Sequence, residues 1–152
     1  MSTRLIKIAA LYLLVGVAMG IVMGIRQQFA LAPVHAHVNL LGWVSLAIIG
    51  VVYRIYPEAA QTRLAHIHFW GHNVGLPVFM LGLALIFSGH AEFHPLVNVG
   101  ATVVFLSVVA FVANVWRALQ PAASAGAATA AAGIAAMGVA KARAATANVA
   151  AR

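Results

Sequence analysis

The sequence predicts an all-α integral membrane protein with four transmembrane helices, on three observations. Of its 152 residues, 64% are hydrophobic and only 7% are charged, whereas soluble domains are about one quarter charged. Four apolar runs each approach the ~20 residues of helix that cross a ~30 Å hydrocarbon layer. The basic residues cluster at the ends of these runs and in the C-terminal tail, as membrane topology signals do. The net charge of +7 therefore does not indicate a nucleic-acid partner.

A transmembrane domain of residues 1–120 is predicted, with the lipid bilayer as its first partner. The four predicted spans are residues 5–25, 33–53, 64–87 and 95–116. Arg4 and Lys7 lie at the beginning of the first span, where a signal peptide also carries basic residues. The apolar stretch of this span is too long, however, and no small-residue cleavage site follows, so we expect an uncleaved anchor. Pro33 and Pro95 suit the first turns of the second and fourth helices.

The positive-inside rule predicts that both termini face the cytoplasm, in an inner-membrane, multi-pass protein. Eight of the nine Lys and Arg residues lie at the beginning of the first span, between the second and third spans, or after the fourth. Only Arg26 lies between the first two spans, so the loops 27–32 and 89–94 should face outward. The alanine-rich tail, residues 121–152, is expected to be cytoplasmic and flexible or loosely helical, with a weak fifth span over 122–140 as the alternative.

Cysteine is absent, which excludes disulfides, thiolate metal sites and Cys-attached haem and leaves histidine as the main ligand type. Small residues also recur at helical spacing. Gly16, Gly20 and Gly24 form a glycine face on the first span, and Gly71 and Gly75 repeat it on the third. Such faces allow close helix approach, so tight contacts are expected within the chain or with a second copy.

His35 and His37, at the start of the second span, are the most informative residues of the chain. A histidine inside a membrane helix is costly and is a candidate functional residue. At about 100° per residue, this i,i+2 spacing directs the two side chains to nearly opposite faces. One metal cannot bind both, but sites on two sides of the helix can take one each. By contrast, His66, His90 and His94 are expected to be solvated residues at the membrane interface.

His68 and His72 are spaced i,i+4 and share a face of the third span. They predict either a buried hydrogen-bond network or a contact to a metal or cofactor. At ~1.5 Å per residue, His72 should lie ~10 Å nearer the cytoplasm than His37. Two imidazoles that share one iron need nitrogens only about 4 Å apart. The second ligand is therefore expected from His90 or His94 in the outer loop, or from another copy of the chain.

A series of motif elements with specific spacing lies between residues 33 and 85. The elements are His35-Ala36-His37, Gly42, Gly50, Tyr53, Pro57, Ala65-His66-Ile67-His68-Phe69-Trp70, Gly75 and Pro77. This series resembles the tenth and eleventh helices of the catalytic subunit of haem–copper oxygen reductases. It is also similar to the haem- and copper-containing NnrS family of membrane proteins. The resemblance covers a little over a third of the chain.

In the oxidase family, the first histidine of the pair binds the high-spin haem and the second binds the low-spin haem. The resemblance implies these roles for His35 and His37. It also implies a haem–copper-oxidase-like four-helix unit, because the family's twelve helices form three four-helix arcs around a pseudo-threefold axis. A chain that resembles one arc is expected to form a homo-oligomer, a trimer by analogy or alternatively a dimer, with histidines of neighbouring copies at equal depth.

The departures from the family pattern restrict the expected chemistry. The chain has no counterpart of the copper-ligating histidine pair, of the tyrosine at the oxygen-reducing site, or of the paired arginines that hold haem propionates. Proton-pumping oxygen reduction is therefore not expected. Whether the chain catalyses any oxidoreductase reaction stays open.

The sequence thus predicts an oligomeric membrane protein that binds haem b for electron transfer, with a redox partner, or for binding a diatomic gas. The candidate cofactor-binding residues are His35, His37, His72 and His68, and the candidates for ligating the metal itself are His37, His35 and His72. One alternative is a histidine-based membrane protein that binds copper or another metal without haem, because imidazole suits copper as well. The other is a structural assembly subunit whose histidines only form hydrogen bonds.

Overall fold

The computed structural model describes residues 1–119, 133–134 and 136–137, and its helical bundle comprises Met1–Ala118. The elements are α1 (Ser2–Arg26), α2 (Ala32–His37), the π-helix η1 (Val38–Ser45), α3 (Leu46–Ile55), the 3-10 turn η2 (Ala59–Gln61), α4 (Arg63–Phe87), the 3-10 turn η3 (Ala91–Phe93) and α5 (His94–Ala118). The described bundle is all-helical, as predicted. The prediction for the tail, 121–152, falls almost entirely outside the described residues.

Four of the described helices are long and apolar enough to cross a membrane. They are Ser2–Arg26, Ala32–Ile55, Arg63–Phe87 and Ala91–Ala118. Each contains one of the four predicted spans, so the predicted number and order of helices long and apolar enough to span a membrane are confirmed. Ala32–Ile55 is one continuous helical span because α2, η1 and α3 follow each other without a break, and Pro33 lies in its first turn as predicted.

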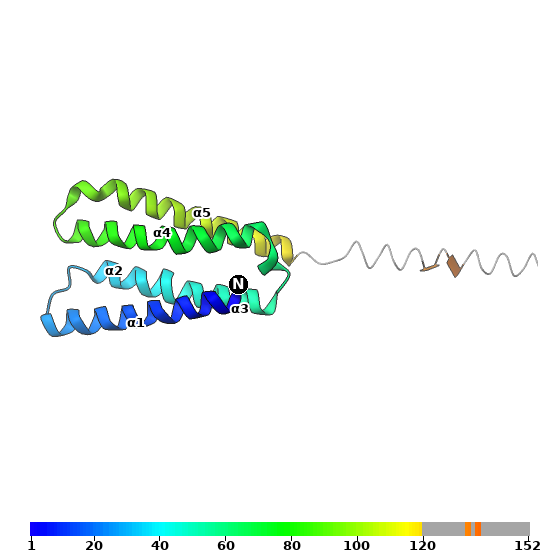
Figure 1. Ribbon diagram of the computed structural model, residues 1–152, viewed down its shortest axis with the longest axis horizontal. Helices are drawn as coiled ribbons and strands as arrows, with labels where there is room; N and C mark the ends of the chain where they lie inside the picture. Colours follow the sequence, from blue (N-terminus) through cyan, green and yellow to red (C-terminus); the bar gives the residue numbers. More distant parts are fainter. Residues whose placement is uncertain (120–132, 135, 138–152) are drawn as a thin grey trace, which may run out of the picture. The chain divides into compact units, whose positions relative to one another are not determined.

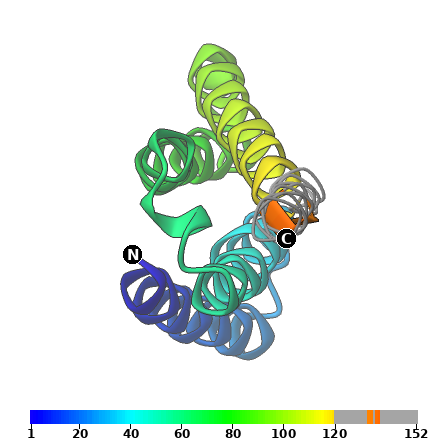
Figure 2. The ribbon, with the colours of Figure 1, turned by 90° about the vertical axis from the view of Figure 1, so that its right-hand side faces the viewer.

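The helices pack as two antiparallel hairpins (Figure 1). In the first hairpin, α1 lies along the α2–η1–α3 span, and in the second α4 lies along α5. The α3–α4 connection, which contains η2, joins the hairpins and faces the viewer in Figure 2. The start of α1, this connection and the end of α5 all lie at one end of the bundle. We call it the basic end, because it carries Arg4, Arg54, Arg63 and Arg117.

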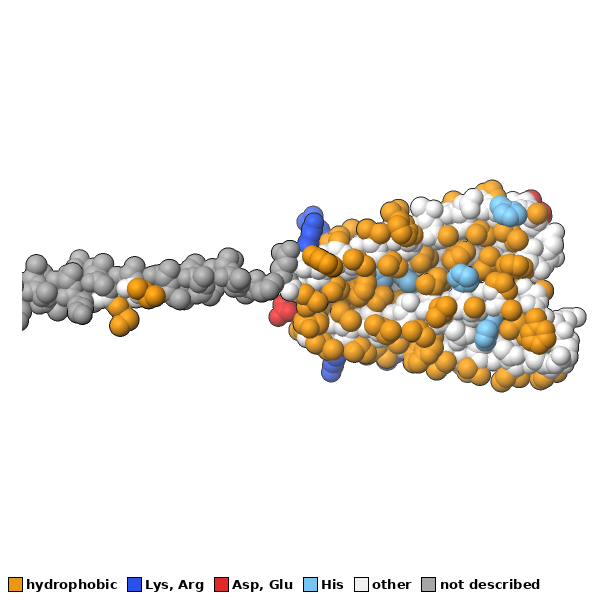
Figure 3. Space-filling model, turned by 180° about the vertical axis from the view of Figure 1, so that it is seen from behind, with side chains coloured by type: hydrophobic (Ala, Val, Ile, Leu, Met, Phe, Trp, Pro, Cys, Tyr) orange, Lys and Arg blue, Asp and Glu red, His pale blue; other side chains and the backbone are white. Residues whose placement is uncertain are grey.

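The face of the bundle seen in Figure 3 is covered largely by apolar side chains, and large apolar side chains are exposed on all four long helices. Large side chains such as Leu14, Ile25, Trp70 and Phe105 are between 64% and 78% exposed. A protein that is surrounded by water rarely exposes so continuous an apolar surface. Lipid is the solvent that suits it, which agrees with a multi-pass membrane protein.

Glycines on α1 bring this helix close to the second span of the same chain. A Cβ atom placed on Gly16 would collide with the side chain of Asn39, and one on Gly20 would lie 3.1 Å from Cε1 of His35. A Cβ on Gly24 would meet no atom within 4 Å. The sequence left open whether this glycine face packs within the chain or against a second copy. At Gly16 and Gly20 it packs within the chain.

The glycines of α4 serve the second hairpin in the same way. A Cβ on Gly71 would lie 3.0 Å from Cβ of Ser107, and one on Gly75 would lie 2.8 Å from Cγ1 of Val103. Both partners belong to α5. Close packing of α4 on α5 thus depends on the absence of side chains at these two positions.

Gly16→Leu is expected to lower the free energy of unfolding by about 1–3 kcal/mol, because the leucine would force Asn39 and the second span away from α1. Gly24→Leu is the matched control on the same helix, since its side chain would enter open space. It should leave stability unchanged or raise it slightly, because leucine favours helix more than glycine does. Thermal unfolding of both variants in one detergent measures the difference. Equal destabilisation by both would contradict the packing described here.

Candidate cofactor site and polar seam

Polar side chains in the interior concentrate where the two hairpins meet. We call this boundary the polar seam, and it consists of His37, Tyr53, Thr62, His68, His72, Ser107 and Asn114. Among the described residues, the buried polar side chains are His68, His72, Ser107 and Asn114, and all four belong to it. The neighbouring core is apolar, with one cluster around Leu46 and another around Leu76.

His35 and His37 contact different helices, as their i,i+2 spacing predicts. The His35 ring lies against Gly20 of α1, within the first hairpin. The His37 ring meets the ring of Phe79 on α4 edge to face, with 5.3 Å between centroids and an interplanar angle of 78°. Only His37 therefore reaches across the polar seam, while His35 stays within its own hairpin.

A hydrogen bond to the backbone fixes the tautomer of the neutral His37 ring. Its Nδ1 lies 2.7 Å from the carbonyl oxygen of Pro33, one turn earlier on α2. Because a carbonyl oxygen only accepts, Nδ1–H must be the donor, and the lone pair of the neutral ring is on Nε2. Metal-binding histidines characteristically donate their other N–H to a carbonyl or carboxylate in this way. His37 is also only partly buried, so its ring edge is not sealed inside the chain.

His72 is fixed from the other hairpin by the π-helix. Its Nε2 lies 3.0 Å from the carbonyl oxygen of Leu41 in η1, so Nε2–H donates and Nδ1 carries the lone pair. Ser107 Oγ lies 3.5 Å from this Nδ1, but its hydroxyl is only 2.7 Å from the carbonyl oxygen of Val104. The single hydroxyl proton therefore goes to Val104, and the Nδ1 lone pair of His72 receives at most a weak bond.

His68 is completely buried, yet neither ring nitrogen has a hydrogen-bond partner among the described residues. Its ring centroid lies 5.4 Å from that of His72, 5.4 Å from that of Phe111 and 6.3 Å from that of Tyr53. A buried polar group without a partner costs about 1–3 kcal/mol. Among the described residues, His68 therefore takes no part in a hydrogen-bond network, which was one of the two alternatives predicted for the His68–His72 pair.

Asn114 closes the polar seam at the basic end. Its Nδ2 donates to the carbonyl oxygen of Ala59 at 2.8 Å and to the hydroxyl of Tyr53 at 3.3 Å. Its Oδ1 accepts from the hydroxyl of Thr62 at 2.6 Å. These bonds tie α5 to α3 and to the α3–α4 connection. Sequence reasoning missed Asn114 and Ser107, although their spacing of seven residues, which puts two polar groups on one face of an apolar helix, was a usable signal.

The three remaining histidines are exposed, as predicted. His66 Nδ1 lies 3.0 Å from the carbonyl oxygen of Thr62, and His94 Nδ1 is bonded to the carbonyl oxygen of Ala91. His90 and His94 flank η3 in the connection between α4 and α5. Neither is buried over the polar seam, so the connection between α4 and α5 does not bring a second imidazole into the interior of the bundle.

His37 and His72 lie at different levels along the bundle axis, as the antiparallel course of their helices predicts. His37 packs beside Phe79, which follows His72 by seven residues on α4, a rise of ~10 Å. The described residues contain no group of three or more His, Asp or Glu side chains that could hold a metal ion. Near the level of His37, one chain therefore directs one imidazole, that of His37, across the polar seam, while His35 faces α1 and His68 and His72 form a separate pair.

Comparisons of the chain with protein-family models, with curated proteins and with solved structures find no match. Assignment of a function therefore rests on the chemistry of the side chains at the polar seam.

Proposed function

We propose that the chain is an oligomeric membrane protein that holds haem b through His37, for electron transfer or for binding a diatomic gas. The observation that carries this proposal is the 2.7 Å hydrogen bond from Nδ1 of His37 to Pro33, at a partly buried ring that packs against Phe79 of α4. His66 and His94 form the same kind of bond, but both are exposed. The bond of His37 fixes the tautomer whose Nε2 can ligate iron, and it restrains the ring before any ligand arrives. Such preorganisation is what an axial haem ligand requires.

The surroundings of His37 suit the same ligand. Val34 and Val38 on its own helix are each 4% exposed, and they pack with Leu76 and Met80 of α4. These side chains are apolar and would shield an iron-bound imidazole from water. When bound, haem b supplies one-electron transfer or an iron position for a gas ligand. The residues of the chain provide the ligand nitrogen, its orientation and the apolar surroundings.

An oligomer accounts for the second axial position. Within one chain, His35 faces α1, His72 lies ~10 Å away along α4, and His90 and His94 are exposed. Around a symmetry axis, however, a histidine of a second copy reaches the same depth as His37. The likeness to one arc of the oxidase fold favours a trimer, and a dimer is the alternative. The charge at the basic end supports an inner-membrane protein with both termini in the cytoplasm.

Copper binding without haem is the second candidate, and His68 favours it. His68 has two unpartnered nitrogens, and the lone pair on Nδ1 of His72 has at most a weak partner. Imidazole is a good ligand for copper. The third reading, a structural subunit whose histidines only form hydrogen bonds, is disfavoured because His68 forms none with the described residues.

One preparation distinguishes these functions by its visible spectrum and metal content. Detergent-purified protein is expected to show a Soret band and iron, and His68→Ala should keep both. If copper is present without a Soret band, the second candidate replaces the first. His68→Ala should then lose the copper, whereas His66→Ala, two residues away and exposed, should keep it. A protein with neither iron nor copper, and none taken up when haem or copper is added, would contradict both.

A further inference from the structure

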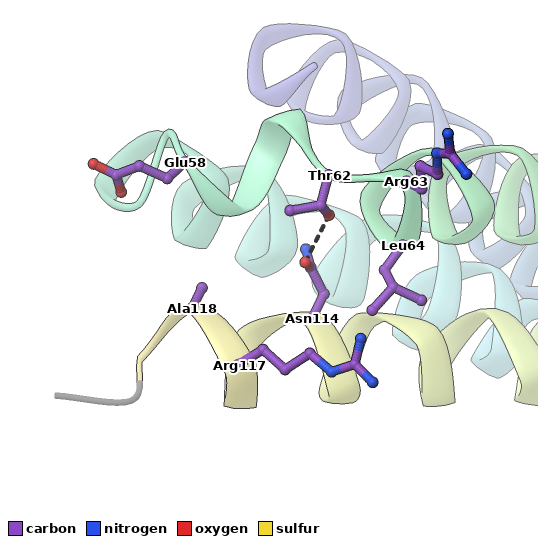
Figure 4. Close-up of a pocket in the computed structure, with 7 residues that line it drawn as sticks. All are labelled: Glu58, Thr62, Arg63, Leu64, Asn114, Arg117 and Ala118. Atoms are coloured by element: carbon purple, nitrogen blue, oxygen red, sulfur yellow. Dashed lines mark hydrogen bonds between the residues drawn. The ribbon is translucent and has the colours of Figure 1, made fainter. Parts of the chain in front are cut away.

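A pocket opens at the basic end, between the α3–α4 connection and the last turn of α5 (Figure 4). Its volume is about 490 Å³, and its lining residues are Glu58, Thr62, Arg63, Leu64, Asn114, Arg117 and Ala118. Two arginines against one glutamate give the pocket a net positive charge. A pocket of this size and charge can receive an anionic group with a small polar attachment.

The floor of this pocket is already formed and its polar groups are satisfied. Thr62 and Asn114 are joined by the 2.6 Å hydrogen bond drawn in Figure 4, and Asn114 is also bonded to Tyr53 and Ala59. In the same view, the carboxylate of Glu58 extends away from the guanidinium groups of the two arginines. The charged lining groups left to bind a ligand from outside are therefore the guanidinium groups of Arg63 and Arg117, which Figure 4 shows on different sides of Leu64.

The pocket lies where two spanning helices end. Arg63 is the first residue of α4, and Arg117 is the penultimate residue of α5. The neighbouring Trp116 is 73% exposed, and tryptophan is enriched at the level of lipid headgroups. If the four apolar helices span the bilayer, both arginines lie at the level of the phosphates of one leaflet.

We propose that this pocket binds the phosphate group of an anionic glycerophospholipid from the leaflet at the basic end. Arginine binds phosphate through two parallel N–H bonds, which a lysine cannot reproduce. A zwitterionic lipid carries the same phosphate with a compensating ammonium group, so the excess positive charge of the pocket selects against it. The apolar outer faces of α4 and α5 accommodate the acyl chains, which favours a lipid over free phosphate.

Native mass spectrometry of the delipidated full chain tests the proposal, with phosphatidylglycerol, phosphatidylcholine and inorganic phosphate each added separately. The wild-type chain is expected to retain phosphatidylglycerol in preference to the other two. Arg63→Gln and Arg117→Gln should each weaken retention about five-fold, as expected for one basic group near an anionic surface. Arg54→Gln is the matched control, because it removes the same charge at the same end of the bundle, outside the pocket.

Arg117→Lys keeps the charge but loses the paired N–H donors, and it is expected to bind phosphatidylglycerol more weakly than the wild type. It also provides a milder change if a glutamine variant fails to fold. Equal retention of phosphatidylcholine, binding of inorganic phosphate as tight as that of the lipid, or an Arg54→Gln effect as large as that of Arg117→Gln would each overturn the proposal. The outcome of this test does not depend on haem binding, because His37 lies near the end of the second span that is far from the basic end.

Discussion

His37→Ala is expected to reduce the haem content of the purified protein about ten-fold or more. The substitution removes the imidazole whose Nδ1 is fixed by Pro33 and whose Nε2 is available to iron. Changing even an outer partner of a metal ligand typically costs about ten- to a hundred-fold in metal affinity, so loss of the ligand itself should cost at least as much. The ratio of Soret absorbance to protein concentration measures the effect.

Two exposed histidines provide the controls for this experiment. His90→Ala and His94→Ala remove imidazoles of the same chemistry from the connection between α4 and α5, so haem content should remain close to the wild-type value. His35→Ala is also expected to lower it, in keeping with the role that the oxidase resemblance implies. The assignment would be wrong if both loop variants lost haem while the His37 and His35 variants retained it.

The sequence predicted the parts of this fold that depend on local composition. The length of the apolar runs identified the four helices that are long and apolar enough to cross a membrane. The i,i+2 spacing of His35 and His37 correctly placed their rings against different helices. The spacing of His68 and His72 placed both on one buried face of α4. These features follow from helix geometry alone, which a single sequence contains.

Features that depend on which helices become neighbours were not predictable. The sequence could not say that Gly16 faces Asn39, or that His72 donates to a carbonyl of the π-helix η1. It also gave no sign that His68 would lack a partner among the described residues, because Tyr53 and Phe111 come from two other helices. Each contact joins two different helices, at positions between 15 and 43 residues apart, and one sequence contains no information on such pairings.

Haem binding is expected to require more than one copy of the chain. Native mass spectrometry in mild detergent reads the number of chains and of haem groups from one spectrum. Oligomers should carry haem, and monomers released by harsher detergent should lose it, because His35 faces α1 and only His37 of one chain is directed across the polar seam at this level. If two copies supply both axial ligands, the reduced spectrum should be low-spin and should not respond to carbon monoxide.

The glycine face of α1 provides a control for this dependence on assembly. Because Gly20 lies against His35 within the same chain, a bulky substitution there should disturb the ring of His35 without directly blocking contact between copies. Gly20→Val is therefore expected to lower haem content while the number of chains in the oligomer stays the same. A stable monomer that keeps a full complement of six-coordinate haem would rule out the shared site. In that case the second ligand would have to come from the same chain, and His90 and His94 would become the residues to substitute next.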